Sequence, residues 1–347
     1  MPEGLKRLRE EIDEQPAVLA RVARAPPAEV VSLARSLQAS PPRAILLVAR
    51  GSSDHAATYG RYLFEVRNRV LTSLAAPSVL TVYGTAPDLR DALVIGVSQS
   101  GQGEDVIAVL REARSQGART AAIVNDRASP LAATAEWVLD CDAGPEESVP
   151  ATKTVTAQML LLGLLSACWR EDDLSTFVDL ADHVRSALDR EDEARALAAH
   201  LAHLDDVSVI GRGFAYPVAL ELALKLKEMA RLHAEAFSSA DFHHGPISLI
   251  GPTHRVLVLD AGGASSQHAV DVARAVARRS TEAYLVRAGR LQGFRDAPAL
   301  AHAADLDEHL APIVLLALSQ RLALEVAVAR GMNPSNPPGL AKVTSTR

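Results

Sequence analysis

The sequence of 347 residues contains little cysteine and no block of basic residues, and each shortage excludes a class of protein. Its two cysteines, Cys141 and Cys168, cannot form a disulfide scaffold and do not have the spacing of a zinc site. We therefore expect a reducing, cytoplasmic environment. The 42 acidic and 36 basic residues give a net charge of −6. This balance disfavours nucleic acid and anionic membranes as partners and leaves small molecules.

Long hydrophobic runs and a leader sequence are also missing. The longest apolar run, about Met159 to Trp169, has near half the length that a membrane span needs. The first residues, from Met1 to Gly4, lack the basic start and the apolar core of a signal peptide. Hydrophobic residues nevertheless make up 48% of the chain, enough to bury a sizeable core. We therefore predict a globular chain that does not contact a membrane.

The sequence does contain a series of short apolar runs, each aliphatic at nearly every residue. Such runs are typical of parallel strands in a sheet that helices cover on both faces. They alternate with helical stretches such as Glu104–Gln116 and Val270–Arg279, which predicts a doubly wound α/β sheet. The predicted strands are Ala44–Ala49, Ala92–Val97, Thr120–Val124, Val207–Gly211, Val256–Leu259 and Ala283–Val286.

These predicted strands repeat at a constant offset of 162 residues. The offset places Ala49–Gly51 on Gly211–Gly213 and Val94–Val97 on Val256–Leu259. One shift that aligns three strands and an Arg-Gly turn predicts two α/β domains with the same fold. We expect an N-terminal helical segment (residues 1–38), a first domain (39–180), a helical connection (181–203), a second domain (204–330) and a non-helical tail (331–347).

The first copy carries hydroxyl groups in two turns where the second copy has none. Ser52 and Ser53 follow its first strand, and Ser98, Gln99 and Ser100 follow its second. Ligands of open α/β sheets bind beyond the carboxyl ends of the strands, and hydroxyls beside free N–H groups at a helix start suit a phosphate. Helix capping is the alternative for a single turn, but two such turns in one copy favour phosphate. The turns lack a P-loop lysine and a dinucleotide fingerprint, so we expect no nucleotide cofactor.

These two turns resemble those of the sugar-isomerase (SIS) domain, a flavodoxin-like α/β domain. The resemblance extends in order from about residue 40 to residue 347 and implies tandem SIS domains that bind a sugar phosphate. Three further segments are similar to the isomerase half of glutamine–fructose-6-phosphate aminotransferase. The segments that carry the resemblance are Ala49–Ala56, Val97–Gly101, Gly144–Thr154, Leu224–Glu228 with His233–Ala236 and His243–Pro246, and Leu340–Thr344.

Within this family, the resemblance implies deamination of a hexosamine 6-phosphate to a ketose phosphate and ammonia. Residue 2 is Pro, where the aminotransferase has its glutaminase cysteine, so we expect no glutamine hydrolysis by this chain. The tail from Lys342 to Thr346 is more similar to SIS-type glucosamine-6-phosphate deaminases. The alternatives are an aldose–ketose isomerase, an aminotransferase-like isomerase without a glutaminase, and a non-catalytic sugar-phosphate sensor. Sensors of this family usually carry a DNA-binding module, which we do not find in the sequence.

Four residues receive catalytic roles from the resemblance. Glu228 would move a proton between C1 and C2, and Lys225, one helical turn earlier, would polarise the substrate oxygen. His244 would open the sugar ring from a neighbouring subunit, which implies a homodimer. Lys342 would contact the sugar carbonyl or form an imine with it. On spacing alone, Glu221, Lys225 and Glu228 could instead form a surface stripe of salt bridges.

The remaining implied contacts bind the substrate. Thr152 and Lys153 would line the site together with the serine turns. The family usually has Ser or Thr at Gly103 and Ser at Ala151, and each lost hydroxyl costs about 0.5–1.5 kcal/mol of hydrogen bonding. No pyridoxal phosphate and no metal are implied, because the chemistry proceeds through an enolamine or enediol of the sugar itself. The pair His200 and His203 has a spacing that could bind a metal, but it lies in a charged helix that favours solvated side chains.

Overall fold

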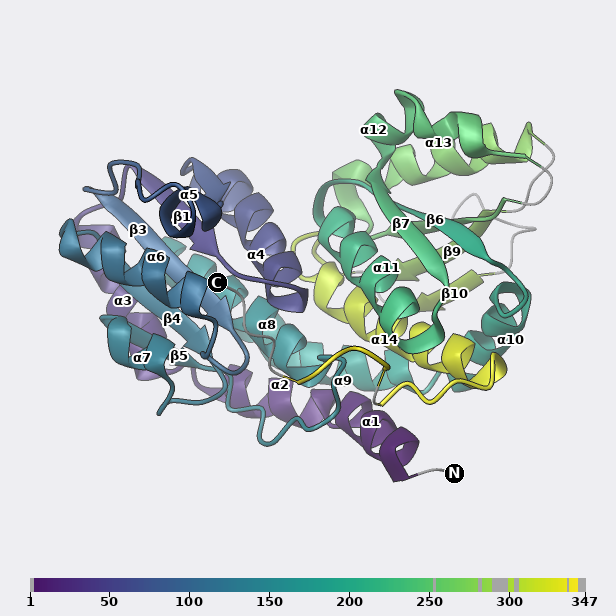
Figure 1. Cartoon of the computed structure of the whole chain (residues 1–347), viewed down its shortest axis with the longest axis horizontal. Helices are drawn as coiled ribbons and strands as arrows, with labels where there is room; N and C mark the ends of the chain where they lie inside the picture. Colours follow the sequence, from purple (N-terminus) through teal and green to yellow (C-terminus); the bar gives the residue numbers. More distant parts are fainter. Residues whose placement is uncertain are drawn as a thin grey trace. The chain divides into compact units, whose positions relative to one another are not determined.

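The computed structural model describes residues 3–251, 254–279, 283–288, 299–302, 306–335 and 337–342 (Figure 1). The chain divides into two compact units, each built around one five-stranded sheet. The first-sheet unit comprises Ala17–Glu146, Lys153–Asp179 and Ala341–Arg347. The second-sheet unit comprises Met1–Pro16, Glu147–Thr152 and Leu180–Leu340.

All strands of the first sheet run parallel, in the order β2-β1-β3-β4-β5. On one face, Val94 of β3 packs with Val106 and Leu110 of α6. On the other, Gly60 of α4 fits between Leu47 of β1 and Leu162 of α8, where any side chain would crowd both leucines. The elements are α2 Gln15–Arg24, α3 Ala28–Ala39, β1 Ala44–Val48, α4 Ser52–Leu63, η1 Phe64–Asn68, β2 Thr72–Leu74, α5 Ser78–Thr81, β3 Ala92–Ser98, α6 Glu104–Ser115, β4 Arg119–Val124, α7 Pro130–Thr134, β5 Trp137–Asp140 and α8 Lys153–Arg170.

The second sheet is also parallel and has the order β10-β9-β8-β6-β7. Phe242 of α12 and Val272 of α13 pack with Val258 of β8 on one face. The second-sheet elements are α1 Glu3–Asp13, α9 Ser175–Leu188 (which begins in the first-sheet unit), α10 Glu191–Leu201, β6 Asp206–Gly211, η2 Gly213–Ala215, α11 Tyr216–Ala230, β7 His233–Ser238, α12 Ser239–His243, η3 Pro246–Leu249, β8 Val256–Asp260, η4 Gly263–Ser265, α13 Ser266–Ala277, β9 Ala283–Ala288, β10 Ala299–His302 and α14 Ala311–Ala329.

Helix α14 is the central helix of the second-sheet unit and packs against α10 and α11. It is long and apolar enough to cross a bilayer, but 94% of its most apolar window is buried inside the protein. Four polar residues interrupt its apolar sequence, and all four are buried. One of them, Gln320, donates from Nε2 to the carbonyl oxygen of Thr152 at 3.2 Å. These properties are those of the core helix of a globular unit.

The two sheets confirm the predicted tandem α/β fold. Each sheet has the same strand order, with β1, β2, β3, β4 and β5 matching β6, β7, β8, β9 and β10. The glycines of the matching turns also share a backbone conformation that side chains disfavour. Gly51 and Gly213 have φ of 56° and 55°, and Gly101 and Gly263 have φ of 62° and 64°. The six predicted strands are all present, within two residues at each end.

The sequence analysis missed four strands, namely β2, β5, β7 and β10. All four lie at the edges of their sheets. Residues 233–236, one of the segments that carry the family resemblance, form most of β7, parallel to β6. This strand alternates buried and exposed residues at its start, so it has no continuous apolar run.

Candidate active site

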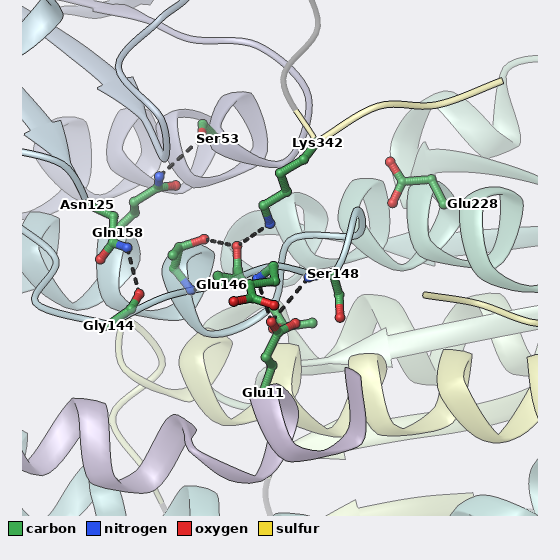
Figure 2. Close-up of polar contacts among 12 residues, drawn as sticks. Glu11, Ser53, Asn125, Gly144, Glu146, Ser148, Gln158, Glu228 and Lys342 are labelled. Atoms are coloured by element: carbon green, nitrogen blue, oxygen red, sulfur yellow. Dashed lines mark hydrogen bonds and ion pairs between the residues drawn. The ribbon is translucent and has the colours of Figure 1, made fainter. Parts of the chain in front are cut away.

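The first serine turn follows β1 and begins α4. Gly51 lies before the helix, and Ser52 and Ser53 are its first two residues. Gln158 of α8, which is fully buried, donates from Nε2 to Ser53 Oγ at 3.1 Å (Figure 2). The Ser53 oxygen is thus engaged as an acceptor, and its own proton remains able to donate. Sequence reasoning missed Gln158, although a lone amide in an apolar helix is a detectable signal.

The second serine turn follows β3, the neighbour of β1 in the sheet, so the two turns lie at the same edge. Ser98 Oγ accepts from the N–H of Gly101 at 3.0 Å, and Ser100 Oγ accepts from the N–H of Gln102 at 3.3 Å. The left-handed Gly101 is required here, because a Cβ would overlap Ser129, the N-cap of α7. Helix α6 starts directly after the turn, at Glu104.

Together these turns form a set of donors suited to an anion. Ser53, Ser98 and Ser100 each use the oxygen as an acceptor within the protein and keep the hydroxyl proton. The start of α6 adds the positive end of its dipole. The side chain of Asp105, in the first turn of α6, is 2% exposed, and its negative charge would repel a phosphate. Arg50 compensates this charge, because its Nε forms an ion pair of 2.6 Å with Asp105 Oδ2.

Asn125, at the end of β4, fastens a neighbouring loop to this edge of the sheet. Its N–H donates to the carbonyl oxygen of Gln99 at 3.1 Å. Its side chain accepts from the N–H of Ala143 at 2.9 Å and donates to the carbonyl oxygen of Gly144 at 2.8 Å (Figure 2). The loop that starts at Gly144 is therefore tied to the second serine turn. Sequence reasoning did not identify Asn125, and a single polar residue after a strand offers no signal by itself.

The carboxylate of Glu146 lies next in this loop and is completely buried. It accepts from the N–H of Thr154 at 3.1 Å and from the Thr154 hydroxyl at 2.8 Å, at the start of α8. The third donor is Lys342 Nζ at 3.0 Å (Figure 2). A buried carboxylate is tolerated when its oxygens are saturated by donors, a helix start and a cation. Glu146 thereby holds the tail lysine, while residues 343–346 of the resembling tail lie outside the described residues.

In the second-sheet unit, Glu221, Lys225 and Glu228 form a connected group on α11. Lys225 Nζ lies 2.6 Å from Glu228 Oε2 and 3.4 Å from Glu221 Oε1. The side chains of Lys225 and Glu221 are 1% and 2% exposed, and that of Glu228 is 18% exposed. This burial excludes the surface stripe of salt bridges that spacing alone allowed. Burial would lower the pKa of Lys225, but the two carboxylates outweigh it and raise the pKa above its usual value.

Glu228 borders a pocket of about 330 Å³ within the second-sheet unit. That size falls in the range of ligand pockets, roughly 300–1,000 Å³. One wall is the end of α11, and the other is the irregular segment after α14. The lining residues are Glu228, Met229, Arg231, Met332, Asn333, Pro337 and Pro338. Glu228, which the sequence analysis assigns as the base, is thus the partly exposed member of the group and lies beside this pocket.

The other predicted site residues lie in different settings. His244 directly follows α12 and is exposed. Thr152 is fully buried, and Lys153 begins α8 with 2% exposure. Gly103 precedes α6 and is partly buried, and Ala151 lies in the loop before α8.

Glu11 of α1 holds the part of this loop that belongs to the second-sheet unit. Its Oε1 accepts from the N–H groups of Glu147 and Ser148 at 2.6 and 3.1 Å (Figure 2). Its side chain comes from the segment before the first strand, which sequence analysis treated only as a helical lead-in. Two carboxylates thus make hydrogen bonds at this loop. Glu146 belongs to the loop, and Glu11 lies on α1, which is remote in sequence.

Comparison with known proteins shows what the chain as a whole is similar to. The family model for the SIS domain matches residues 40–167 and 200–286. Glutamine–fructose-6-phosphate aminotransferase (isomerizing) of Methanothermobacter thermautotrophicus is 34% identical over 301 residues, which cover 86% of this chain and 51% of that protein. The chain thus spans about half the length of the curated relatives it matches.

Two solved structures show the same fold. A protein of Silicibacter pomeroyi DSS-3, provisionally described as a phosphosugar isomerase, has 34% identity and a TM-score of 0.87, with 94% of this chain and 99% of that chain covered. Glucosamine-6-phosphate deaminase of Thermotoga maritima has 21% identity and a TM-score of 0.79, with 98% and 100% covered. The latter likeness concerns the fold alone.

Proposed function

Since the chain belongs to the SIS domain family, we propose that it is a sugar-phosphate isomerase that deaminates a hexosamine 6-phosphate. The products are a ketose 6-phosphate and ammonia. The observation that carries this proposal is the pair of serine turns, whose hydroxyls are held as acceptors by the protein and retain their protons for an anion. The names of the relatives, an isomerising aminotransferase and a provisionally described phosphosugar isomerase, support the same substrate class.

In this proposal the phosphate binds at the serine turns, and α11 supplies the proton transfer. Glu228 removes the proton from C2 of the open-chain amino sugar, which gives an enolamine between C1 and C2. The proton then returns to C1, and the resulting imine at C2 takes up water and releases ammonia. Lys225, buried and positively charged beside Glu228, stabilises negative charge that develops on the substrate oxygen.

Lys342 and His244 complete the proposed site. Lys342 is held by Glu146 and contacts the sugar near its carbonyl carbon. His244 opens the sugar ring by proton exchange at the ring oxygen. Because His244 is exposed at the end of α12, we propose that it acts in the site of a second copy of the chain, in a homodimer. The proposed reaction needs no cofactor or metal.

The direct test is turnover of a panel of phosphorylated amino sugars, with ammonia and ketose phosphate measured in parallel. We expect equal amounts of both products from one hexosamine 6-phosphate. Ketose phosphate without ammonia, formed from an aldose phosphate, would instead identify an isomerase without deamination. Binding of sugar phosphates without any turnover would identify a sensor.

The serine turns are tested by replacing Ser98 and Ser100 together with Ala. We expect KM for the phosphorylated sugar to rise by at least about tenfold, because two hydrogen bonds to a charged group, each about 1.5–3 kcal/mol, are lost. The matched measurement uses the same sugar without its phosphate, for which KM should change little. An equal rise for both sugars would contradict the phosphate assignment.

A further inference from the structure

In the second repeat, the turn that matches the second serine turn holds a carboxylate of the chain itself. Glu308 Oε2 accepts from the N–H of Ala264 at 2.8 Å. Glu308 Oε1 accepts from the N–H of Ser265 at 3.2 Å and from the Ser265 hydroxyl at 2.7 Å. Gly263 allows this approach, because a Cβ at that position would overlap the Glu308 side chain. Three donors at the start of a helix thus converge on one anionic group.

This turn is the structural counterpart of the turn that begins at Ser98. Helices α6 and α13 follow the two turns directly and have equal lengths, and Gly101 and Gly263 share a left-handed φ. In the first repeat, Ser98 Oγ accepts from the N–H of Gly101. In the second, Asp260 Oδ1 accepts from the N–H of Gly262 at 2.8 Å. The turn therefore keeps its left-handed glycine, while a carboxylate, Asp260, stands where the first repeat has Ser98.

The charges around the second turn are consistent with a bound anion. Asp260, at the end of β8, would repel one, but Arg287 Nη1 lies 2.6 Å from Asp260 Oδ2 and neutralises it. Arg287 is 8% exposed, and its Nε has no hydrogen-bond partner among the described residues. The cation of this pair is thus incompletely satisfied beside the turn. Gly263 and Ala264 are exposed, so the turn lies at the surface of its unit.

We propose that Glu308 is a built-in anion that fills, in the second repeat, the position that we assign to the substrate phosphate in the first. The comparison rests on the proposed phosphate site, whereas the contacts of Glu308 stand by themselves. The carboxylate closes the second turn to phosphate and ties residues 306–310 to the start of α13. An intramolecular carboxylate acts at a high effective concentration, so free phosphate does not displace it. The chain therefore binds one sugar phosphate.

The test removes the carboxylate by Glu308→Ala in a chain that also carries Ser98→Ala and Ser100→Ala. The two serine substitutions weaken the first site, so that phosphate binding to the second repeat can be measured separately. Equilibrium dialysis against labelled inorganic phosphate gives the number of phosphates bound per chain. We expect no saturable site in the serine double variant and one in the triple variant. The melting temperature of the triple variant should rise in sodium phosphate and not in sodium chloride of equal ionic strength.

Two further variants keep the result decisive. Glu308→Gln retains one oxygen that can accept from Ser265, so it should leave the turn filled and bind no phosphate. Asp307→Ala removes an exposed neighbouring acid and, added to the serine double variant, should leave it without phosphate binding.

Absence of phosphate binding in the folded triple variant would overturn the proposal. Binding after Asp307→Ala that equals the binding after Glu308→Ala would also overturn it. If Glu308→Ala prevents folding, Glu308→Ser takes its place, because its side chain is too short to fill the turn and leaves all three donors intact. This variant should bind phosphate, and failure to do so would also overturn the proposal. Neither result depends on whether the first repeat binds a sugar phosphate.

Discussion

At the scale of single residues, the site is built from polar groups that hold other polar groups. Gln158 engages the oxygen of Ser53, Asn125 fastens the loop beside the second serine turn, and Glu146 holds Lys342. In each case the supporting residue is placed by the sheet or by α8 and fixes a group that was recognised from the sequence. These hydrogen bonds fix the side chains before substrate binds, so that binding has less side-chain entropy to remove.

Replacing Glu146 by Gln should release Lys342 from its buried partner. The amide can still accept from Thr154, but the charged hydrogen bond to Nζ, about 1.5–3 kcal/mol, is lost. We expect trypsin to cleave after Lys342 at least about tenfold faster, measured by mass spectrometry of timed digests, since about 1.4 kcal/mol corresponds to a factor of ten. Glu147→Gln, a change at an exposed neighbour, is the control. Unchanged cleavage after Glu146→Gln would show that the ion pair does not hold the tail.

The supporting residues illustrate what the sequence could and could not provide at this scale. The serines were found because they follow two predicted strands of the first copy, and Glu228 was found because its segment resembles a family. Asn125 and Glu11 were not found, because their function depends on backbone groups distant in sequence. Such hydrogen bonds have no signature in residue type or spacing.

At the scale of elements, the central strands were predictable and the edge strands were not. β1, β3, β4, β6, β8 and β9 are apolar almost throughout because helices cover both of their faces. The edge strand β2 has only three residues, and β7 includes two exposed positions. Sheet edges are partly solvated and tolerate polar residues, so their sequences lose the pattern on which strand prediction depends.

The edge strand β10 carries a histidine that should make the second-sheet unit sensitive to acid. His302 is buried against α9, where its Nε2 lies 3.2 Å from Nδ1 of His183. Burial, assisted by the charges of His183 and Arg190, lowers the pKa of His302 to about 4. Between this value and about 6.5 the unfolded chain binds one proton more than the folded chain, so stability falls as the pH falls. The slope is at most about 1.4 kcal/mol per pH unit.

We expect His302→Gln to reduce this loss of stability between pH 6.5 and 4.5. Urea unfolding at several pH values measures it as the shift of the midpoint. The variant can be less stable at pH 7, because a buried contact to His183 is altered, but its slope with pH should be smaller than that of the unmodified chain. His268→Gln, at an exposed position on α13, provides the control. Identical slopes for His302→Gln and the unmodified chain would rule out His302 as the source.

At the scale of the whole molecule, the duplicated fold is used asymmetrically. The first repeat keeps two hydroxyl groups, Ser98 and Ser100, in its second serine turn, and the second repeat fills the equivalent turn with its own carboxylate. The second repeat instead carries the buried group on α11 that ends in Glu228. The sequence revealed this asymmetry through the loss of serines after the matching strands. The internal anion was not predictable, because Glu308 lies more than forty residues after the turn it occupies.

The proposed sharing of His244 between two copies can be tested by mixing two inactive variants. Glu228→Gln lacks the base, and His244→Asn lacks the ring-opening group, so each alone should have little activity. If the site combines Glu228 of one copy with His244 of the other, a mixed dimer contains one intact site and one site that lacks both groups. Random exchange makes half of the dimers mixed, so activity should recover to about a quarter of that of the unmodified enzyme. Native mass spectrometry verifies the exchange, and Lys227→Ala, at an exposed position of α11, is the control for a change on the same helix. Verified mixed dimers whose activity stays at the mean of the two parents would place His244 in the site of its own chain or outside the reaction.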